Sequence, residues 1–281
     1  MNLSAIFNSV NKTNLMTKQF LTFLLFACTL LSCEKNNLNY SVDSEYPTVA
    51  KKLNSATLSE LRTSFAQKNK YLSSSLNDYG FCSLTDIQVS ADTPPILSAP
   101  TQPEAIETVK SFVSLNPACT GVENASDLTF TQIFSSTPYW DGASSMVLKS
   151  ANQRIDTIEV INSQIIFQLK SRELVYCMGN WFPKVYIPNK FNIDREDAKS
   201  SLLNKVVWHS TIAGVPYSAT ITAASLAAST TRLVVFPYSK TADNIELRVT
   251  WQINIPGPVY YLIFVDVMTG EIIGEQPTII S

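Results

Sequence analysis

The change of hydrophobic period along residues 103–274 constrains the fold more than any other feature of this sequence. Residues 103–115 carry apolar side chains at helical spacing, with Pro103 in the first turn, and the helix is expected to end at Asn116-Pro117. The side chains expected to face inward are those of Ala105, Val109, Phe112 and Val113. Beyond Leu128 apolar residues alternate with polar ones, which predicts strands with one buried face.

Four strands are predicted in this first unit, at residues 128–133, 155–160, 164–169 and 173–181. The last two are expected to pair with each other. The pattern therefore predicts a helix followed by an antiparallel meander over about 103–187.

The same order then repeats. A second helix is predicted to begin after Asp194, because this carboxylate can cap the exposed amides and Asp197 suits the positive end of the helix dipole. Its expected apolar stripe consists of Ala198, Leu202 and Val206. Further strands are predicted at about 214–222, 231–238, 245–254, 258–267 and 271–274.

The last predicted hairpin turns within residues 266–271. Gly270 can adopt the left-handed conformation that such a turn needs, and Asp266 and Thr269 can bond the turn amides before Glu271. A helix packed across a curled antiparallel sheet, twice over, is an α+β architecture.

Particular motifs in this region resemble a known family. Residues 245–273 contain WQINI and FVDVMTGEI, and residues 193–198 read IDREDA, which resembles the PepSY domain. Residues 112–136 and 154–185 resemble the FTP module, the propeptide half found before fungalysin- and thermolysin-type metallopeptidases. The FTP strand pattern Q-x-x-x-G-I/V-P-V is only partly kept, as RIDTIEV from Arg154.

The resemblance covers about residues 100–275. It implies an FTP-like module at 103–190 and a PepSY-like module at 191–276, each a helix with a curled antiparallel sheet, cystatin-like in outline. Upstream, residues 53–102 are expected to form a helix at 53–70 and then a proline-rich connection. Thr57 and Glu60 have the spacing of a capping box for that helix.

The N-terminal region has the pattern of an export signal. An apolar run from Phe20 to Leu31 follows Lys18 and is too short to span a membrane. It ends in Leu30-Leu31-Ser32-Cys33, which resembles the lipobox of bacterial lipoproteins. This resemblance implies cleavage between Ser32 and Cys33 and a lipid on the Cys33 thiol; the alternative is a plain secretory signal with an incidental cysteine.

Several expectations follow from this signal. Residues 1–32 form the leader, with translation starting at Met16, and residues 33–52 form a flexible tether. The acyl chains implied by the resemblance, palmitate among them, anchor the protein to the cell envelope. Glu34 after the cysteine favours the outer membrane. The formal net charge of −2 gives no electrostatic case for binding nucleic acid.

Catalytic and metal-binding patterns are missing from the sequence. The single histidine, His209, precludes the H-E-x-x-H zinc helix, and no G-x-S-x-G elbow frames Ser210 or another serine. No cofactor, metal or catalytic residue is therefore predicted, and the protein is not expected to be an enzyme. Tryptophans at 140, 181, 208 and 251 are interpreted as sheet core rather than as a binding surface.

Three cysteines remain after the leader and the lipid site, namely Cys82, Cys119 and Cys177. Cys119 and Cys177 fall in one predicted module and are the candidate disulfide in an oxidising compartment. The alternative is that all three are small buried apolar residues.

Two functions are compatible with this sequence. The first is a lipid-anchored, propeptide-like module that binds a protein partner and inhibits a secreted metallopeptidase or assists its folding. The second is a structural or ligand-binding envelope lipoprotein without a peptidase partner, since a fold does not determine a function.

Overall fold

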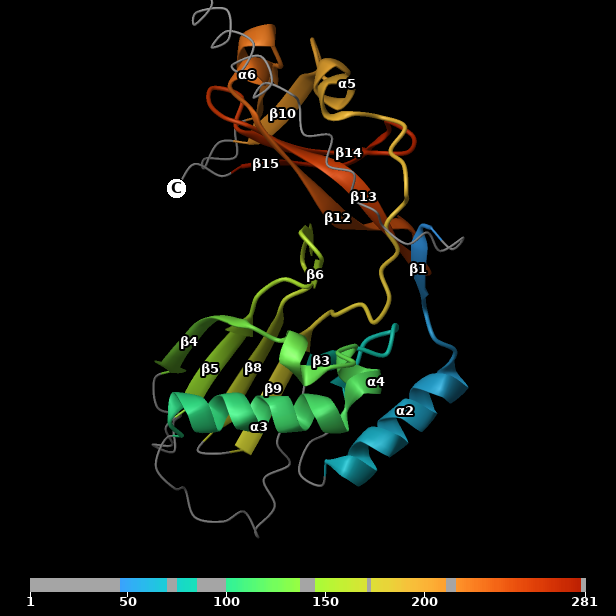
Figure 1. Ribbon diagram of the computed structural model, residues 1–281, viewed down its shortest axis with the longest axis vertical. Coiled ribbons are helices and arrows are strands. Elements are labelled where there is room, and N and C mark those ends of the chain that lie inside the picture. The colour runs from blue at the N-terminus through green and yellow to red at the C-terminus, as the bar shows by residue number, and fades with distance from the viewer. Residues whose placement is uncertain are drawn as a thin grey trace, which may run out of the picture. The chain divides into compact units, whose positions relative to one another are not determined.

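A computed structural model describes residues 46–69, 75–84, 100–136, 145–170, 173–210 and 216–278 (Figure 1). The chain divides into two units, Met1–Asn39 and Tyr40–Ser281, and every described residue belongs to the second. The predicted leader, Cys33 and most of the tether lie outside the described residues. None of the helices in the described part combines the length and the apolar character needed to cross a bilayer.

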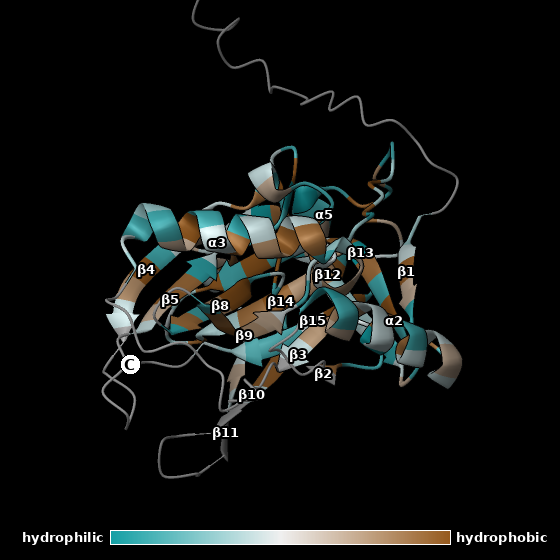
Figure 2. Ribbon diagram, turned by 90° about the horizontal axis from the view of Figure 1, so that it is seen from below, coloured by the Kyte–Doolittle hydropathy of each residue, from teal (hydrophilic) through white to brown (hydrophobic). Residues whose placement is uncertain are grey.

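Helix α3 (Gln102–Leu115) lies across one face of a four-stranded antiparallel sheet, which Figures 1 and 2 both show. Thr101 and Glu104 form a reciprocal capping box at its start, which was not predicted. Its C-cap is Asn116, and the sequence did predict that the helix ends there. The four residues predicted to face inward are all buried. The amphipathic pattern therefore identified both the helix and its packed face.

The sheet under α3 has the order β4-β5-β8-β9. The strands are β4 (Phe130–Ser136), β5 (Ser145–Ser150), β8 (Ile165–Lys170) and β9 (Glu173–Gly179). The predicted pairing of the last two is confirmed, with Phe167 opposite Cys177. Strand β5 was not predicted, although it lies in the middle of the sheet.

The segments before α3 depart most from expectation. Helix α2 (Ser55–Lys68) is capped by Asn54, which accepts a hydrogen bond from the amide of Thr57, so Thr57 lies inside the helix and not at its cap. Strand β1 (Thr48–Lys51) pairs with β13 in a region predicted to be tether. Elements β2 (Ser75–Leu76), β3 (Cys82–Leu84), α4 (Pro117–Thr120) and the 3-10 turn η1 (Ala125–Asp127) complete this half.

A seven-stranded sheet forms the second half, in the order β15-β14-β13-β12-β7-β6 with β1 also paired to β13. Its strands are β6 (Arg154–Ile155), β7 (Ile158–Val160), β12 (Thr230–Thr241), β13 (Asn244–Ile255), β14 (Tyr261–Asp266) and β15 (Ile272–Pro277).

The sequence assigned residues 155–160 to the meander of the first unit, which is wrong. Strand β7 instead pairs in parallel with β12, Val160 opposite Val235. Both valines are fully buried in a core shared by the two halves of the chain. Burial of β7 between the two halves therefore determines which sheet it joins, and the hydrophobic period of the sequence does not report this.

Two short helices and a two-stranded ribbon cover part of the second sheet. These are α5 (Arg195–Ser200), α6 (Ala223–Ala227), β10 (Val206–Ser210) and β11 (Pro216–Thr220). Asp194 caps α5 as predicted, and Ala198 and Leu202 are buried. Val206 is not part of the helix stripe, because it lies on β10 and is 48% exposed. Its neighbour Trp208 is 65% exposed, so its interpretation as sheet core is wrong.

The final hairpin turn has close side-chain support. Asp266 Oδ1 accepts hydrogen bonds from the amides of Met268 (2.7 Å) and Thr269 (2.9 Å), and Thr269 Oγ1 accepts one from the amide of Glu271 (3.2 Å). Gly270 has φ +73°, a left-handed conformation. The α+β prediction is confirmed by the packing of helices on antiparallel sheets in both halves.

Candidate functional site

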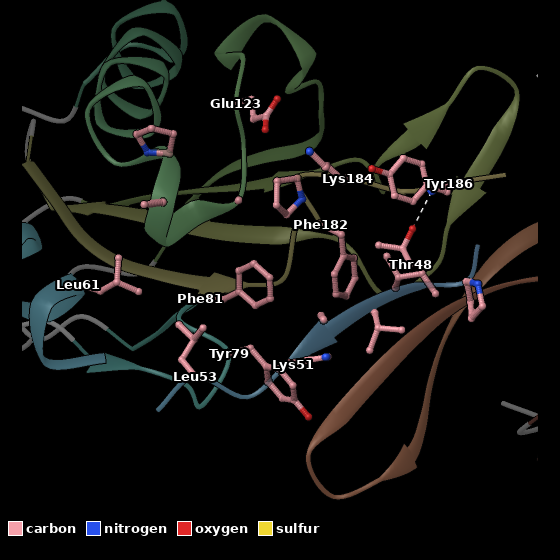
Figure 3. Close-up of a pocket in the computed structure, with 18 residues that line it drawn as sticks. Thr48, Lys51, Leu53, Leu61, Tyr79, Phe81, Glu123, Phe182, Lys184 and Tyr186 are labelled. Carbon is pink, nitrogen blue, oxygen red and sulfur yellow. Dashed lines mark hydrogen bonds between the residues drawn. The ribbon is translucent and has the colours of Figure 1, made fainter. Parts of the chain in front are cut away.

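A cleft of about 800 Å³ is the best candidate site among the described residues (Figure 3). It is enclosed by β1, the first half of α2 with Leu53 ahead of it, the β2–β3 hairpin, α4 and the segment 182–186. Its apolar lining consists mainly of Leu53, Leu61, Tyr79, Phe81, Phe182 and Leu247. A concave apolar site of this size is typical of ligand-binding clefts.

Two phenylalanines form the inner wall of the cleft. The rings of Phe81 and Phe182 meet edge to face with centroids 5.7 Å apart. Buried Gln153 holds Phe182 through two hydrogen bonds: its Nε2 donates to the Phe182 carbonyl (2.6 Å), and its Oε1 accepts from the Phe182 amide (3.1 Å). The wall is thus positioned by a side chain that lies behind it.

The backbone packs closely beside this wall. Gly121 follows α4 with φ +73°, and a Cβ there would lie 1.8 Å from the carbonyl oxygen of Trp181. Only glycine fits this approach, since any side chain would collide with backbone. The loop after α4 and the segment after β9 therefore meet at one side of the cleft.

Strand β1 forms the opposite wall and is fastened at both sides. Thr48 Oγ1 accepts a hydrogen bond from the amide of Tyr186 (2.8 Å), which Figure 3 marks, and Thr48 lies opposite Leu247 in the sheet. The Tyr46 hydroxyl accepts from the amide of Val249 (2.9 Å). Burial raises the pKa of Tyr46 to about 12, which keeps this hydroxyl neutral.

Charged side chains lie at the rim of the cleft. Lys51, Glu123 and Lys184 line it and are exposed, and Figure 3 shows that they come from different segments. Lys52, next to Lys51, pairs with Asp78 at 2.9 Å. Within the described part of the chain, Lys51 and Lys184 make no ion pair. Both lysines lie at the rim, beside whatever occupies the cleft.

A smaller polar hollow of about 390 Å³ shares Gly121, Glu123 and Pro183 with the cleft. Asn152 lies in its wall and donates to Glu159, while its own Oδ1 is buried without a partner in the described structure. Burial alone would raise the pKa of Glu159, but hydrogen bonds from Asn152 and Arg232 outweigh it and hold that pKa below its ordinary value.

The residues singled out from sequence are not brought together at the cleft. Ser32 and Cys33 lie outside the described residues. The turn residues Asp266, Thr269, Gly270 and Glu271 stabilise a hairpin and do not line the cleft. His209 lies on β10, and its side chain is not described.

The three cysteines all carry thiols and are buried in the core beneath α3. The pairing of Cys119 with Cys177 stays a prediction. Among the described residues, no group of three histidine, cysteine, aspartate or glutamate side chains is arranged to hold a metal ion.

Sequence reasoning missed every residue of the cleft. The cleft joins segments around positions 48, 80, 121 and 182, which are far apart in the chain. The only local signal is the small apolar and aromatic clusters at 79–81 and 181–183, which sequence alone reads as ordinary core.

Comparison with known proteins provides no family. No protein-family model matches the chain, and no curated protein matches it. Among solved structures it is similar to the Bacillus megaterium YpeB C-terminal domain, with 11% identity and a TM-score of 0.32 over 81% of this chain and 99% of that one. It is also similar to an uncharacterized protein from Eubacterium rectale, with 10% identity and a TM-score of 0.37 over 81% and 85%. At such TM-scores no functional property carries over.

Proposed function

We propose that this protein is a non-catalytic binding module, anchored to the bacterial cell envelope by a lipid on Cys33, that holds an extended segment of a secreted protein in the cleft beside β1. The observation that carries the proposal is the cleft itself, with its apolar floor and its lysines at the rim. Resemblance of the C-terminal half to PepSY domains adds a partner class, a secreted metallopeptidase.

The chemistry of the cleft specifies what the bound segment should contain. An apolar side chain would cover the floor around Phe81 and Phe182, which supplies affinity through burial. A carboxylate would pair with Lys51 or Lys184, which supplies orientation and register more than affinity. We therefore expect a segment with a large apolar residue and a nearby acidic residue or a terminal carboxylate.

The proposed anchor keeps the cleft near the membrane. Cys33 and Tyr46 are 13 positions apart, about 45 Å at full extension. Strand β1 begins two residues after Tyr46 and is itself a wall of the cleft. A partner held there would remain within a few nanometres of the lipid, which raises its effective concentration for membrane-bound steps.

Site-specific photo-crosslinking tests the proposal. A photoreactive residue at position 184, at the rim, should capture an envelope protein, and the matched position Glu196, exposed on α5, should not. Lys184→Glu and Lys51→Glu should each weaken capture, whereas Lys190→Glu, also exposed but outside the cleft, should not. Equal capture from positions 184 and 196 would refute the role of the cleft.

Two further measurements test the remaining parts of the proposal. Labelling with a fatty-acid analogue should mark the natural protein and leave Cys33→Ser unmarked. Captured proteins should include a peptidase whose activity changes when micromolar amounts of this protein are added. If only this last result fails, the peptidase is excluded as the partner, and the proposal of a binding module stands.

A small molecule is the second candidate occupant. The cleft volume falls within the range of sites that enclose drug-sized ligands, which favours this alternative. Native mass spectrometry of protein purified from its own envelope distinguishes the two, because a retained lipid or metabolite adds a fixed mass that Phe182→Ala should abolish.

A further inference from the structure

Three buried thiols converge in the core beneath α3. Cys82 begins β3, Cys119 lies on the short helix α4, and Cys177 lies on β9. Their exposed fractions are 2%, 4% and 1%, and all three belong to one packed cluster. From sequence, Cys119 with Cys177 was the favoured pair among the three cysteines; the fold places Cys82 in the same cluster.

Cys82 and Cys177 lie on strands that pack against each other. Strand β3, which begins with Cys82, packs along β9, which carries Cys177. A hydrogen bond with Cys82, together with burial, raises the pKa of Cys177 well above its ordinary value. For Cys119, burial is the main cause that raises the pKa, to about 11, with Cys82 a nearby contributor.

We propose that Cys82 and Cys177 form a disulfide when the chain folds in an oxidising compartment, and that Cys119 keeps its thiol. The compartment rests on the proposed export, but the choice of pair rests on the packing of β3 against β9. In solution the oxidant is a small disulfide such as glutathione disulfide, and in the envelope it is a dithiol oxidase of the same chemistry.

The exchange proceeds in two steps. One cysteine thiolate attacks glutathione disulfide, forms a mixed disulfide and releases one glutathione thiolate. The second cysteine thiolate then attacks the protein sulfur of the mixed disulfide and releases the second glutathione. Two protein thiols are oxidised, one glutathione disulfide is reduced, and the two thiol protons end on the two glutathiones. Because burial disfavours the thiolates, both steps take place before the core closes.

The bond would stabilise the cleft. Each cysteine lies close in sequence to one of the two rings of the aromatic wall. Cys82 directly follows Phe81, and Cys177 precedes Phe182 by five residues. A bond between them closes a loop from residue 82 to residue 177 and joins the two segments that carry these rings. Reduction should therefore loosen the aromatic wall as well as lower stability.

Peptide mapping of the full-length chain with Cys28→Ser and Cys33→Ser tests the pairing without requiring export. After refolding with glutathione and glutathione disulfide, thiols titrated in denaturant should fall from three per chain to one, and the linked peptides should contain Cys82 and Cys177. The urea midpoint should fall by about 1–2 M on reduction. Cys119→Ala should keep that shift, and Cys82→Ala should lose it.

Three results would overturn the proposal: three thiols after oxidation, a link from Cys119 to either other cysteine in the unmutated cluster, or a shift that disappears with Cys119→Ala. The mapping needs no substitution in the cluster, so misfolding of a variant cannot hide the answer. If the natural protein is absent from the envelope fraction, the proposed export is wrong. The proposed cysteine pairing is then decided by the peptide map of the refolded chain alone.

Discussion

Replacement of Gln153 by leucine should remove the support of the cleft wall with little change in side-chain volume. Gln153 is 5% exposed and makes two hydrogen bonds to the peptide groups of Phe182. Phe182 itself is 2% exposed, so water cannot easily replace the lost partner. The substitution therefore leaves one buried amide and one buried carbonyl unsatisfied.

The magnitude follows from those two groups. A buried polar group that loses its partner costs about 1–3 kcal/mol. Two such groups, partly offset by the better burial of leucine, predict a loss of about 2–4 kcal/mol in the free energy of unfolding. That is a large part of the stability of an ordinary domain.

Urea unfolding followed by circular dichroism measures the effect. Gln132→Leu is the matched control, because Gln132 is exposed on β4, and it should change the unfolding free energy by no more than about 0.5 kcal/mol. A loss at Gln153 no larger than this control, with the same m-value, would refute the reasoning.

Gln153→Glu provides a second test through pH. A carboxylate there would face the Phe182 carbonyl, so its pKa in the folded state should be raised above the unfolded value. The variant should come closest to the natural protein in unfolding free energy below about pH 4.3, the pKa of an unfolded glutamate. Its unfolding free energy should then fall relative to the natural protein as the pH rises through the pKa of the folded state. A pH-independent deficit would contradict the assigned geometry.

Three other predictions concern the frame around the cleft. The pKa of Tyr46 is about 12 in the folded protein and near 10 in the unfolded chain, so the neutral hydroxyl of Tyr46 should contribute fully to stability below pH 10. About 2–3 kcal/mol of stability should be lost between pH 10 and 12. Tyr46→Phe should abolish this loss in urea titrations carried out at a series of pH values. Gly121→Ala should cost about 2–4 kcal/mol in the same assay, since its Cβ would collide with the Trp181 carbonyl; a cost below 0.5 kcal/mol would show that the loop moves freely. Asp266→Ala should lower the unfolding free energy by about 2–4 kcal/mol by leaving two turn amides without an acceptor, and Asp266→Asn, which keeps the acceptor, should cost less; equal losses would assign the effect to charge instead.

Local signals in the sequence predicted local structure well. The end and the apolar face of α3, the Asp194 cap of α5 and the left-handed Gly270 all depend on residues within one or two turns of chain. Such signals work because the hydrogen bonds that satisfy a helix end or a hairpin turn are made by neighbours. Where two local residues competed, as Asn54 and Thr57 did for the cap of α2, sequence chose wrongly.

Long-range pairing was beyond the sequence. Strand β7 alternates like a member of the meander around it, yet it pairs in parallel with β12, some 75 residues away. Strand β1 similarly leaves the predicted tether to pair with β13. Alternation reports that a strand has a buried face and does not report which sheet buries it.

By itself, the sequence determined the α+β class, most helices and strands, and the prediction that Cys33 carries a lipid. Tertiary structure decided the cleft, the Gln153 support behind Phe182 and the packing of β3, which carries Cys82, against β9, which carries Cys177. The physical reason is the range of the interactions concerned. Caps, turns and periodicity are satisfied within a few residues, whereas a cleft wall or a thiol pair exists only after segments about 30 to 200 residues apart have been packed together.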